Sequence, residues 1–123
     1  MSSPRSRLGK SAEIAAAAEL GKRGYRIVDS NYHVRGGEID LIAYDGDTLV
    51  FVEVRARSSF GFGTPADTVS RTKRAKIVHT AENYLFQKNL EPNGIRFDVV
   101  EVEIRDGKPV VLDVLCGAFD AEG

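Results

Sequence analysis

The sequence predicts a single α/β domain in which helices cover a mixed sheet of about five strands. Helical and extended patterns follow one another in the order helix, three strands, helix, two strands. The run DTLVFVEV, residues 47–54, is apolar at most positions, which indicates a strand buried on both faces. The dipeptides Asp45-Gly46 and Asp106-Gly107 each separate two extended runs and indicate tight hairpin turns.

The first helix is predicted over residues 11–23, SAEIAAAAELGKR. Ser11 suits a helix cap, Ala and Leu favour the helical conformation, and Gly24 suits its end. Residues 25–34, YRIVDSNYHV, then alternate weakly toward a strand. Gly36-Gly37 interrupts the chain before the next strand.

A second helix is predicted from Pro65 or Ala66 to Lys88. The last two strands are predicted over residues 95–104 and 109–116. The apolar residues of this second helix that fall near one face are Val69, Ile77, Ala81, Tyr84 and Leu85. We expect one domain over residues 1–123, with flexible ends at 1–8 and 118–123.

The composition excludes several classes of protein. Cys116 is the one cysteine, so no internal disulfide forms, and with only His33 and His79 beside it there is no zinc-ligand spacing. We expect ordinary hydrogen bonds from both histidines. Glu13 and Glu19 interrupt the apolar stretch near the start, so it is neither a signal peptide nor a membrane span. We therefore expect a cytoplasmic protein without a membrane partner.

Charge is segregated along the chain although the net charge is only −1. Residues 1–37 carry +4, 38–53 carry −5, 54–88 carry +5 and 89–123 carry −5. Basic segments on both sides of an acidic one guide a polyanion toward a metal site, unless folding scatters the blocks.

Residues 36–57, GGEIDLIAYDGDTLVFVEVRAR, place several carboxylates on one predicted hairpin. A two-residue turn at Asp45-Gly46 sets Glu38 opposite Glu53 and makes Asp40 a diagonal neighbour of Glu53, roughly 7–8 Å away. Alternation then assigns one face to Glu38, Asp40, Phe51, Glu53 and Arg55, and the other to Ile39, Leu41, Val50, Val52 and Val54. Opposed carboxylates are unfavourable, so the hairpin predicts a site for Mg²⁺, which takes one or two carboxylates with waters and phosphate oxygens.

Arg55 shares the predicted acidic face and lies two residues beyond Glu53. One interpretation is that it binds a phosphate oxygen or stabilises charge in a phosphoryl-transfer transition state. The alternative is a salt bridge to Glu38 or Glu53 at the rim of the sheet.

These motifs resemble a known family. The pattern E-x-D-L-I-A, a short turn, F-V-E-V-[K/R]-x-R and the following FGTPADTVSRTKRAKI are similar to the YraN-like uncharacterised bacterial proteins. That family is similar to archaeal Holliday-junction resolvases of the PD-(D/E)xK nuclease superfamily. The resemblance extends from about Leu8 to Val102 and implies a restriction-endonuclease-like core.

The resemblance also implies a metal-dependent nuclease site. Asp40 and Glu53 would hold Mg²⁺ or Mn²⁺, and the backbone carbonyl of Val54 would be a further ligand. Resolvase-like members carry a Glu on the first helix, which Glu13 matches, although the helix dipole alone also favours an acid in a first turn. Glu38 either supplements the site or pairs with Arg55.

Arg55 departs from the superfamily pattern, in which lysine is usual. A guanidinium stays protonated, so Arg55 is no base for activating water, but it still stabilises negative charge. Lys73 is a candidate to provide an ammonium near the site.

Groups around the site suit nucleic acid. In the loop SSFGFGTP, residues 58–65, Phe60 or Phe62 either stacks on unpaired bases or caps the core. The residues expected to contact the phosphate backbone are Arg57, Arg71, Lys73, Arg74 and Lys76. The alternative for the helical cluster is a solvated helix face.

The sequence thus favours a Mg²⁺-dependent endonuclease that hydrolyses phosphodiesters of structured or branched DNA. A homodimer is also expected, because resolvase-like relatives cut two strands symmetrically. One alternative is a non-catalytic nucleic-acid-binding module that retains the fold. Another is a protein-interaction domain whose acidic hairpin contacts a basic partner.

Overall fold

The structure, a computed structural model, describes residues 4–58 and 69–121, with side chains over 9–57 and 69–121. Its elements follow the predicted order αβββαββ, consistent with a restriction-endonuclease-like core. They are α1 (Pro4–Lys22), β1 (Arg26–Val34), β2 (Gly37–Asp45), β3 (Thr48–Ser58), α2 (Arg71–Gln87), β4 (Gly94–Arg105) and β5 (Lys108–Phe119). The strands form one sheet in sequence order, in which β3 and β4 are parallel and the other neighbours are antiparallel.

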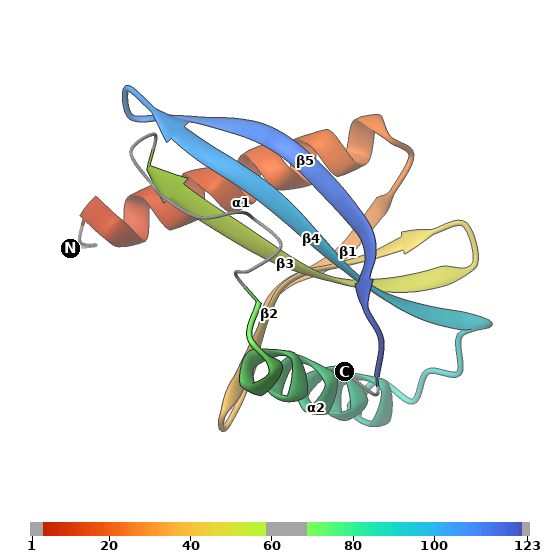
Figure 1. Cartoon of the computed structure of the whole chain (residues 1–123). Coiled ribbons are helices and arrows are strands. Elements are labelled where there is room, and N and C mark those ends of the chain that lie inside the picture. Colours follow the sequence, from red (N-terminus) through yellow and green to blue (C-terminus); the bar gives the residue numbers. More distant parts are fainter. Residues whose placement is uncertain (1–3, 59–68, 122–123) are drawn as a thin grey trace.

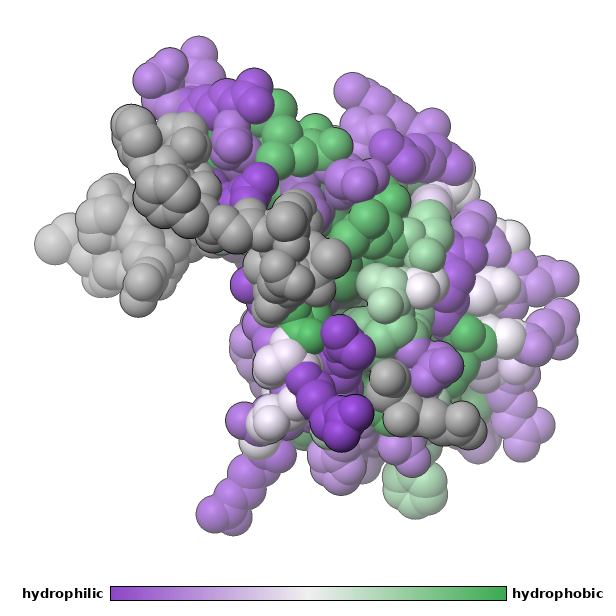
Figure 2. Space-filling model, in the orientation of Figure 1, coloured by the Kyte–Doolittle hydropathy of each residue, from purple (hydrophilic) through white to green (hydrophobic). Residues whose placement is uncertain are grey.

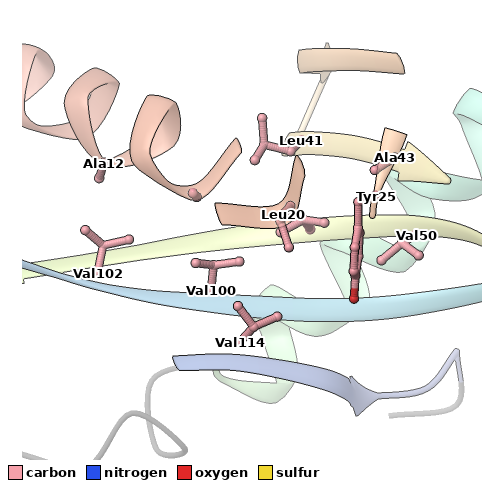
Figure 3. Packing of buried hydrophobic residues seen from close by; sticks show 11 residues of the cluster. Ala12, Leu20, Tyr25, Leu41, Ala43, Val50, Val100, Val102 and Val114 are labelled. Atoms are coloured by element: carbon pink, nitrogen blue, oxygen red, sulfur yellow. The ribbon is translucent and has the colours of Figure 1, made fainter. Parts of the chain in front are cut away.

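The two helices pack against the sheet through two separate cores (Figure 1). Under α1, Ala12 and Leu20 face Val100 and Val102 of β4 (Figure 3). Under α2, the second core includes Phe51 with other residues of the sheet and of α2. β3 supplies buried side chains to both cores, which confirms the prediction of a strand buried on both faces.

α1 begins at Pro4, seven residues before the predicted cap at Ser11, which lies inside the helix. Proline suits the first position of a helix because its missing N–H has no partner there in any case. The predicted end is confirmed, since Gly24 has a φ of 92° and the N–H of Tyr25 donates to the carbonyl of Leu20 at 3.0 Å.

α2 begins at Arg71 rather than at the predicted Pro65 or Ala66, positions that lie outside the described residues. Ser70 has extended backbone and its hydroxyl accepts from the N–H of Lys73 at 3.1 Å, as an N-cap does. In the described part of the chain, neither helix combines the length and apolar character needed to cross a membrane.

The predicted turn of the β2–β3 hairpin is wrong by one residue, which shifts the predicted pairing of the two strands by two residues. Asp45 pairs with Thr48, so Gly46 and Asp47 form the turn, with Gly46 at φ 61°. Leu41 therefore lies opposite Val52. One residue further in the same register, Asp40 and not Glu38 corresponds to Glu53.

The faces of the hairpin are mostly as predicted, because a shift of two in the pairing preserves alternation. Leu41 and Val52 pack under α1, and Phe51 packs under α2. Ile39 is the exception: it belongs to the core under α2, and it lies beyond the point where the pairing of β2 with β3 ends.

A buried polar network lies on the face of the sheet that α1 covers, whereas Glu53 lies on the face that α2 covers. Asp98 is fully buried and accepts hydrogen bonds from the Tyr25 hydroxyl at 2.8 Å, Arg96 Nε at 2.8 Å and the N–H of Gly117 at 3.0 Å. Arg96 Nη2 also lies 2.9 Å from Oδ2 of Asp45. These groups join β2, β4 and β5 to the segment after α1, and they satisfy a charge that would otherwise be costly to bury.

Candidate metal centre

The candidate site lies where β2 and β3 separate. Their pairing ends at Leu41 and Val52, and Asp40 is the next residue of β2. Its Oδ2 accepts a 2.7 Å hydrogen bond from the backbone N–H of Val54. Because the N–H and C=O of one strand residue point to the same edge, the carbonyl of Val54 faces the side on which Asp40 lies. We call this point of separation between β2 and β3 the fork. It brings together the Asp40 carboxylate and the Val54 carbonyl, two of the ligands that the resemblance implies.

Glu53 is buried beneath α2, with 6% of its side chain exposed. Its Oε1 lies 2.6 Å from Nζ of Lys73, a residue in the first turn of α2. Lys73 keeps 46% of its side chain exposed, so the ammonium reaches the site from the solvent side. The structure thus brings a lysine to the site from α2, next to the Glu that precedes Val54.

The electrostatics of the fork oppose a second negative charge. Burial, and next the negative charge of Glu53, raise the pKa of Asp40 from 3.8 to about 8. The hydrogen bond from Val54 acts the other way and lowers this pKa. A bound cation between the carboxylates would relieve the repulsion.

Glu13 approaches the same site from α1. Its Oε1 accepts a 2.8 Å hydrogen bond from Nδ2 of Asn31, and its negative charge also raises the pKa of Asp40. Since α1 begins at Pro4, Glu13 does not lie in a first helical turn. The helix-dipole explanation for an acid at this position therefore fails.

Glu38 lies at the periphery. It is exposed, and its Oε2 is 3.8 Å from Nδ1 of His33, its partner in the β1–β2 ladder. Its charge is the last of the causes that raise the pKa of Asp40. Arg55 is half-buried on β3 and lies opposite Glu101 of β4.

The predicted nucleic-acid contacts separate into groups. Arg74 is held at the end of the sheet, because its Nε donates to the carbonyl of Val69 at 2.9 Å and its guanidinium carbon lies 5.9 Å from the centre of the Phe119 ring. Arg71 and Lys76 line a hollow beside the β1–β2 turn. Arg57 is half-buried on β3. The predictions for Phe60 and Phe62 lie outside the described residues.

The residues fit a Mg²⁺ or Mn²⁺ ion only as a partial ligand set. Asp40, Glu53 and the carbonyl of Val54 supply oxygen atoms, the kind of ligand that hard cations prefer. Within the described ranges, no three His, Cys, Asp or Glu side chains group closely enough to form a site by themselves. Such a set suits an ion that keeps waters and takes oxygens from a substrate phosphate.

Sequence reasoning misses Glu101, which is 1% exposed on β4 opposite Arg55. Its signal is an acid among the apolar residues of a strand buried on both faces. The contact between Lys73 and Glu53 has no local signal, because it depends on how α2 packs against the sheet.

Comparisons of the sequence with known proteins point to one family. Residues 12–102 match the model of "Uncharacterised protein family UPF0102". The chain is 44% identical over 119 residues to a UPF0102 protein of Anaeromyxobacter dehalogenans, covering 97% of this chain and 88% of that protein. It is 43% identical over 120 residues to a UPF0102 protein of Moorella thermoacetica, covering 97% and 100% of the two chains. A UPF0102 protein of Desulforapulum autotrophicum is 45% identical over 122 residues, 99% of this chain and all of the relative.

Proposed function

The chain belongs to the uncharacterised protein family UPF0102, as its YraN-like resemblance predicted, and we propose that it is a divalent-metal-dependent endonuclease acting on structured or branched DNA. One observation carries the proposal. The carboxylate of Asp40 accepts a hydrogen bond from the N–H of Val54 in the fork between β2 and β3. Val54 directly follows Glu53, which is buried and paired with Lys73.

Each side chain has a role in this proposal. Asp40 and Glu53, with the carbonyl of Val54, would hold Mg²⁺ or Mn²⁺. A bound ion of this kind supplies Lewis-acid polarisation of a phosphate and a lowered pKa for water. Lys73, already beside Glu53, stabilises negative charge that builds on the phosphodiester oxygens. Arg55 remains protonated and adds to that stabilisation.

Isothermal titration with Mg²⁺ and Mn²⁺ tests the site directly. We expect the native chain and Asp47→Asn, the same chemical change at an exposed turn residue, to bind either ion. Asp40→Asn should bind at least tenfold more weakly while circular dichroism shows that it is folded. Equal binding by Asp40→Asn, or none by the native chain at millimolar metal with DNA present, would overturn the proposal.

Cleavage is tested on branched, flapped and single-stranded DNA with Mg²⁺ or with EDTA. We expect products with Mg²⁺ from the native chain and Asp47→Asn, and none from Asp40→Asn.

A second candidate is a nucleic-acid-binding module without catalysis. Two observations favour it: Arg55 stands where the superfamily has lysine, and Glu53 already has an ion-pair partner in Lys73. This candidate predicts DNA binding that is equally strong with Mg²⁺ and with EDTA, and no products from any of the DNA structures.

A further inference from the structure

A basic hollow lies between the β1–β2 turn and the first half of α2. Its volume is about 520 Å³. Four of its lining residues are basic: Arg35, Arg71, Lys76 and His79. All four are exposed, so the hollow is open to a ligand that approaches along the surface. Hydrophilic residues gather over the start of α2 and the neighbouring turn in the space-filling view (Figure 2).

Close packing fixes the wall that carries Arg35. A Cβ atom added to Gly37 would lie 2.0 Å from Oγ1 of Thr80 and 3.2 Å from the carbonyl oxygen of Lys76. The strand therefore approaches α2 as closely as only glycine allows. This contact holds the β1–β2 turn beside the first half of α2 (Figure 1), so that Arg35 and Lys76 line the same hollow.

The start of α2 carries positive charge that the fold does not compensate. The first turn of α2 holds Arg71, Lys73 and Arg74 and no acidic residue. A helix N-terminus carries partial positive charge, so cations there reduce the stability of the helix. Among the described residues, no ion pair involves Arg35, Arg71 or Lys76. Such an arrangement is stabilised when an anion binds.

We propose that this hollow binds backbone phosphates of a nucleic-acid strand that runs on to the Asp40–Glu53 centre; the second half of this statement rests on the proposed function. Lys73 links the two places, because it contacts Glu53 and lies one helical turn from Lys76, about 5–6 Å between Cβ atoms. Phosphates on one strand of a duplex are spaced about 3.4 Å along the axis. The hollow therefore holds phosphates within a few nucleotides of the centre.

Contacts of this kind position a strand without reading its sequence. We therefore expect affinity that depends strongly on salt and little on base composition. An anionic membrane surface is the competing ligand for a basic patch. The hollow lies near Glu53, which Lys73 contacts, and this favours nucleic acid. A carboxylate centre would repel the phosphates of a membrane surface, whereas a nuclease site needs one beside its substrate.

The test measures binding of a fluorescein-labelled 20-nucleotide single strand and of a four-way junction by anisotropy. All samples contain EDTA, so cleavage plays no part. Arg35→Gln/Lys76→Gln removes two charges from the hollow. Lys22→Gln/Lys108→Gln removes two exposed charges elsewhere and has the same net charge. Urea unfolding checks that both variants are folded.

We expect the hollow variant to bind at least tenfold more weakly at 100 mM salt, and the control variant to stay within twofold of the native chain. The slope of log affinity against log salt should fall by about 1.4–1.8 in the hollow variant, as for two lost phosphate contacts. Equal binding by the two variants would overturn the inference. The inference would also be overturned if the native chain bound vesicles containing 30% phosphatidylserine but bound neither the single strand nor the four-way junction.

The two proposals fail separately. If DNA binding depends on the hollow but Asp40→Asn changes neither metal binding nor cleavage, the nuclease proposal fails and the hollow stands. If Mg²⁺-dependent cleavage is found and the hollow variant binds and cleaves as the native chain does, the hollow fails and the nuclease proposal stands.

Discussion

Nζ of Lys73 on α2 lies 2.6 Å from Oε1 of Glu53 on β3, although the two residues are far apart in the chain. Burying a carboxylate is costly unless it is paired, and Lys73 supplies the pair. The contact attaches the first turn of α2 to the sheet at the candidate centre. It also brings there an ammonium, the group that the PD-(D/E)xK nucleases, which the sequence resembles, have at the position of Arg55.

The stability of the metal-free chain should depend on this pair. We expect Lys73→Met to lower the free energy of unfolding by about 1–3 kcal/mol, because the buried Glu53 carboxylate loses its cation. The exposure of Lys73 keeps the loss below that for a fully buried pair. Urea unfolding in EDTA measures it. Lys76→Met, exposed on the same helix, is the control and should change stability by less than about 0.5 kcal/mol.

A double-mutant cycle with Glu53→Gln separates the pair from other effects of each change. The combined variant should lose less stability than the two single changes together, because each single change already removes the same interaction. Additive losses, or a loss from Lys73→Met no larger than from Lys76→Met, would show that the contact does not stabilise the fold.

Catalysis, if the proposed function holds, should depend more on Lys73 than on the chemistry of Arg55. We expect Lys73→Met to lower the cleavage rate at saturating Mg²⁺ by about 10²–10³, the loss typical of removing one group that stabilises transition-state charge. Arg55→Lys retains a cation at its position and should stay within about tenfold of native. Single-turnover cleavage of the best substrate measures both, and a larger loss in Arg55→Lys would reverse the assignment.

The pKa of Asp40 predicts how stability changes with pH. An unfolded aspartate loses its proton near pH 4, whereas the folded chain keeps it on Asp40 until about pH 8. Between these values the folded state binds more protons, so the free energy of unfolding should fall as pH rises from about 4 to about 8. Below pH 4 both states hold the proton and the contribution is constant.

Asp40→Asn cannot titrate and should remove this part of the pH dependence. Urea unfolding at pH 5, 6.5 and 8 in EDTA measures the slope for the native chain and the variant, with Asp47→Asn as the exposed control. The native chain and Asp47→Asn should lose stability toward pH 8 more steeply than Asp40→Asn. Parallel curves for all three would contradict the raised pKa.

Local patterns predicted much of this fold. Apolar residues at successive positions identified β3 as buried on both faces, and Gly24 marked the end of α1, because both features depend on residues close in sequence. The same reasoning paired Asp40 with Glu53 in one site. The turn was placed one residue too early, since Asp45-Gly46 and Gly46-Asp47 both offer a glycine to the turn and only the packing of both strands decides between them.

Other features depend on tertiary packing and had no local signal. The position of Lys73 follows from the placement of α2 on the sheet, and α2 begins at Arg71, after its cap Ser70, rather than at the more conspicuous Pro65. The helix-dipole explanation for Glu13 is excluded only once α1 is known to begin at Pro4. Asp98 is a further case, because its partners come from β4, from β5 and from the residue before β1.

The Asp98 network should stabilise the fold without affecting the candidate site. We expect Asp98→Asn to lower the free energy of unfolding by about 3 kcal/mol, because Arg96 and Tyr25 lose a buried charged partner. Metal binding should be unchanged under conditions where the variant is folded, since the network lies on the face of the sheet opposite Glu53. Asp106→Asn in the β4–β5 turn is the control, and equal stability of the two variants would contradict the prediction.

Gly37 should tolerate no side chain. We expect Gly37→Ala to lower the free energy of unfolding by about 1–3 kcal/mol, because its Cβ would lie 2.0 Å from Oγ1 of Thr80. Gly21→Ala is the control: a Cβ there meets nothing within 4 Å, and alanine favours the helix by up to about 1 kcal/mol.

Thr80→Ala tests the cause of that loss. Alone, it removes the 2.7 Å hydrogen bond from Oγ1 to the carbonyl of Lys76. Combined with Gly37→Ala it also removes the atom that clashes, so the double variant should be more stable than the two separate losses predict, by about 0.5–3 kcal/mol. Additive losses would mean that the β1–β2 turn does not rest on α2 through this contact. Because the contact also places Arg35, Gly37→Ala should weaken DNA binding in EDTA at temperatures where it is still folded, and Gly21→Ala should not.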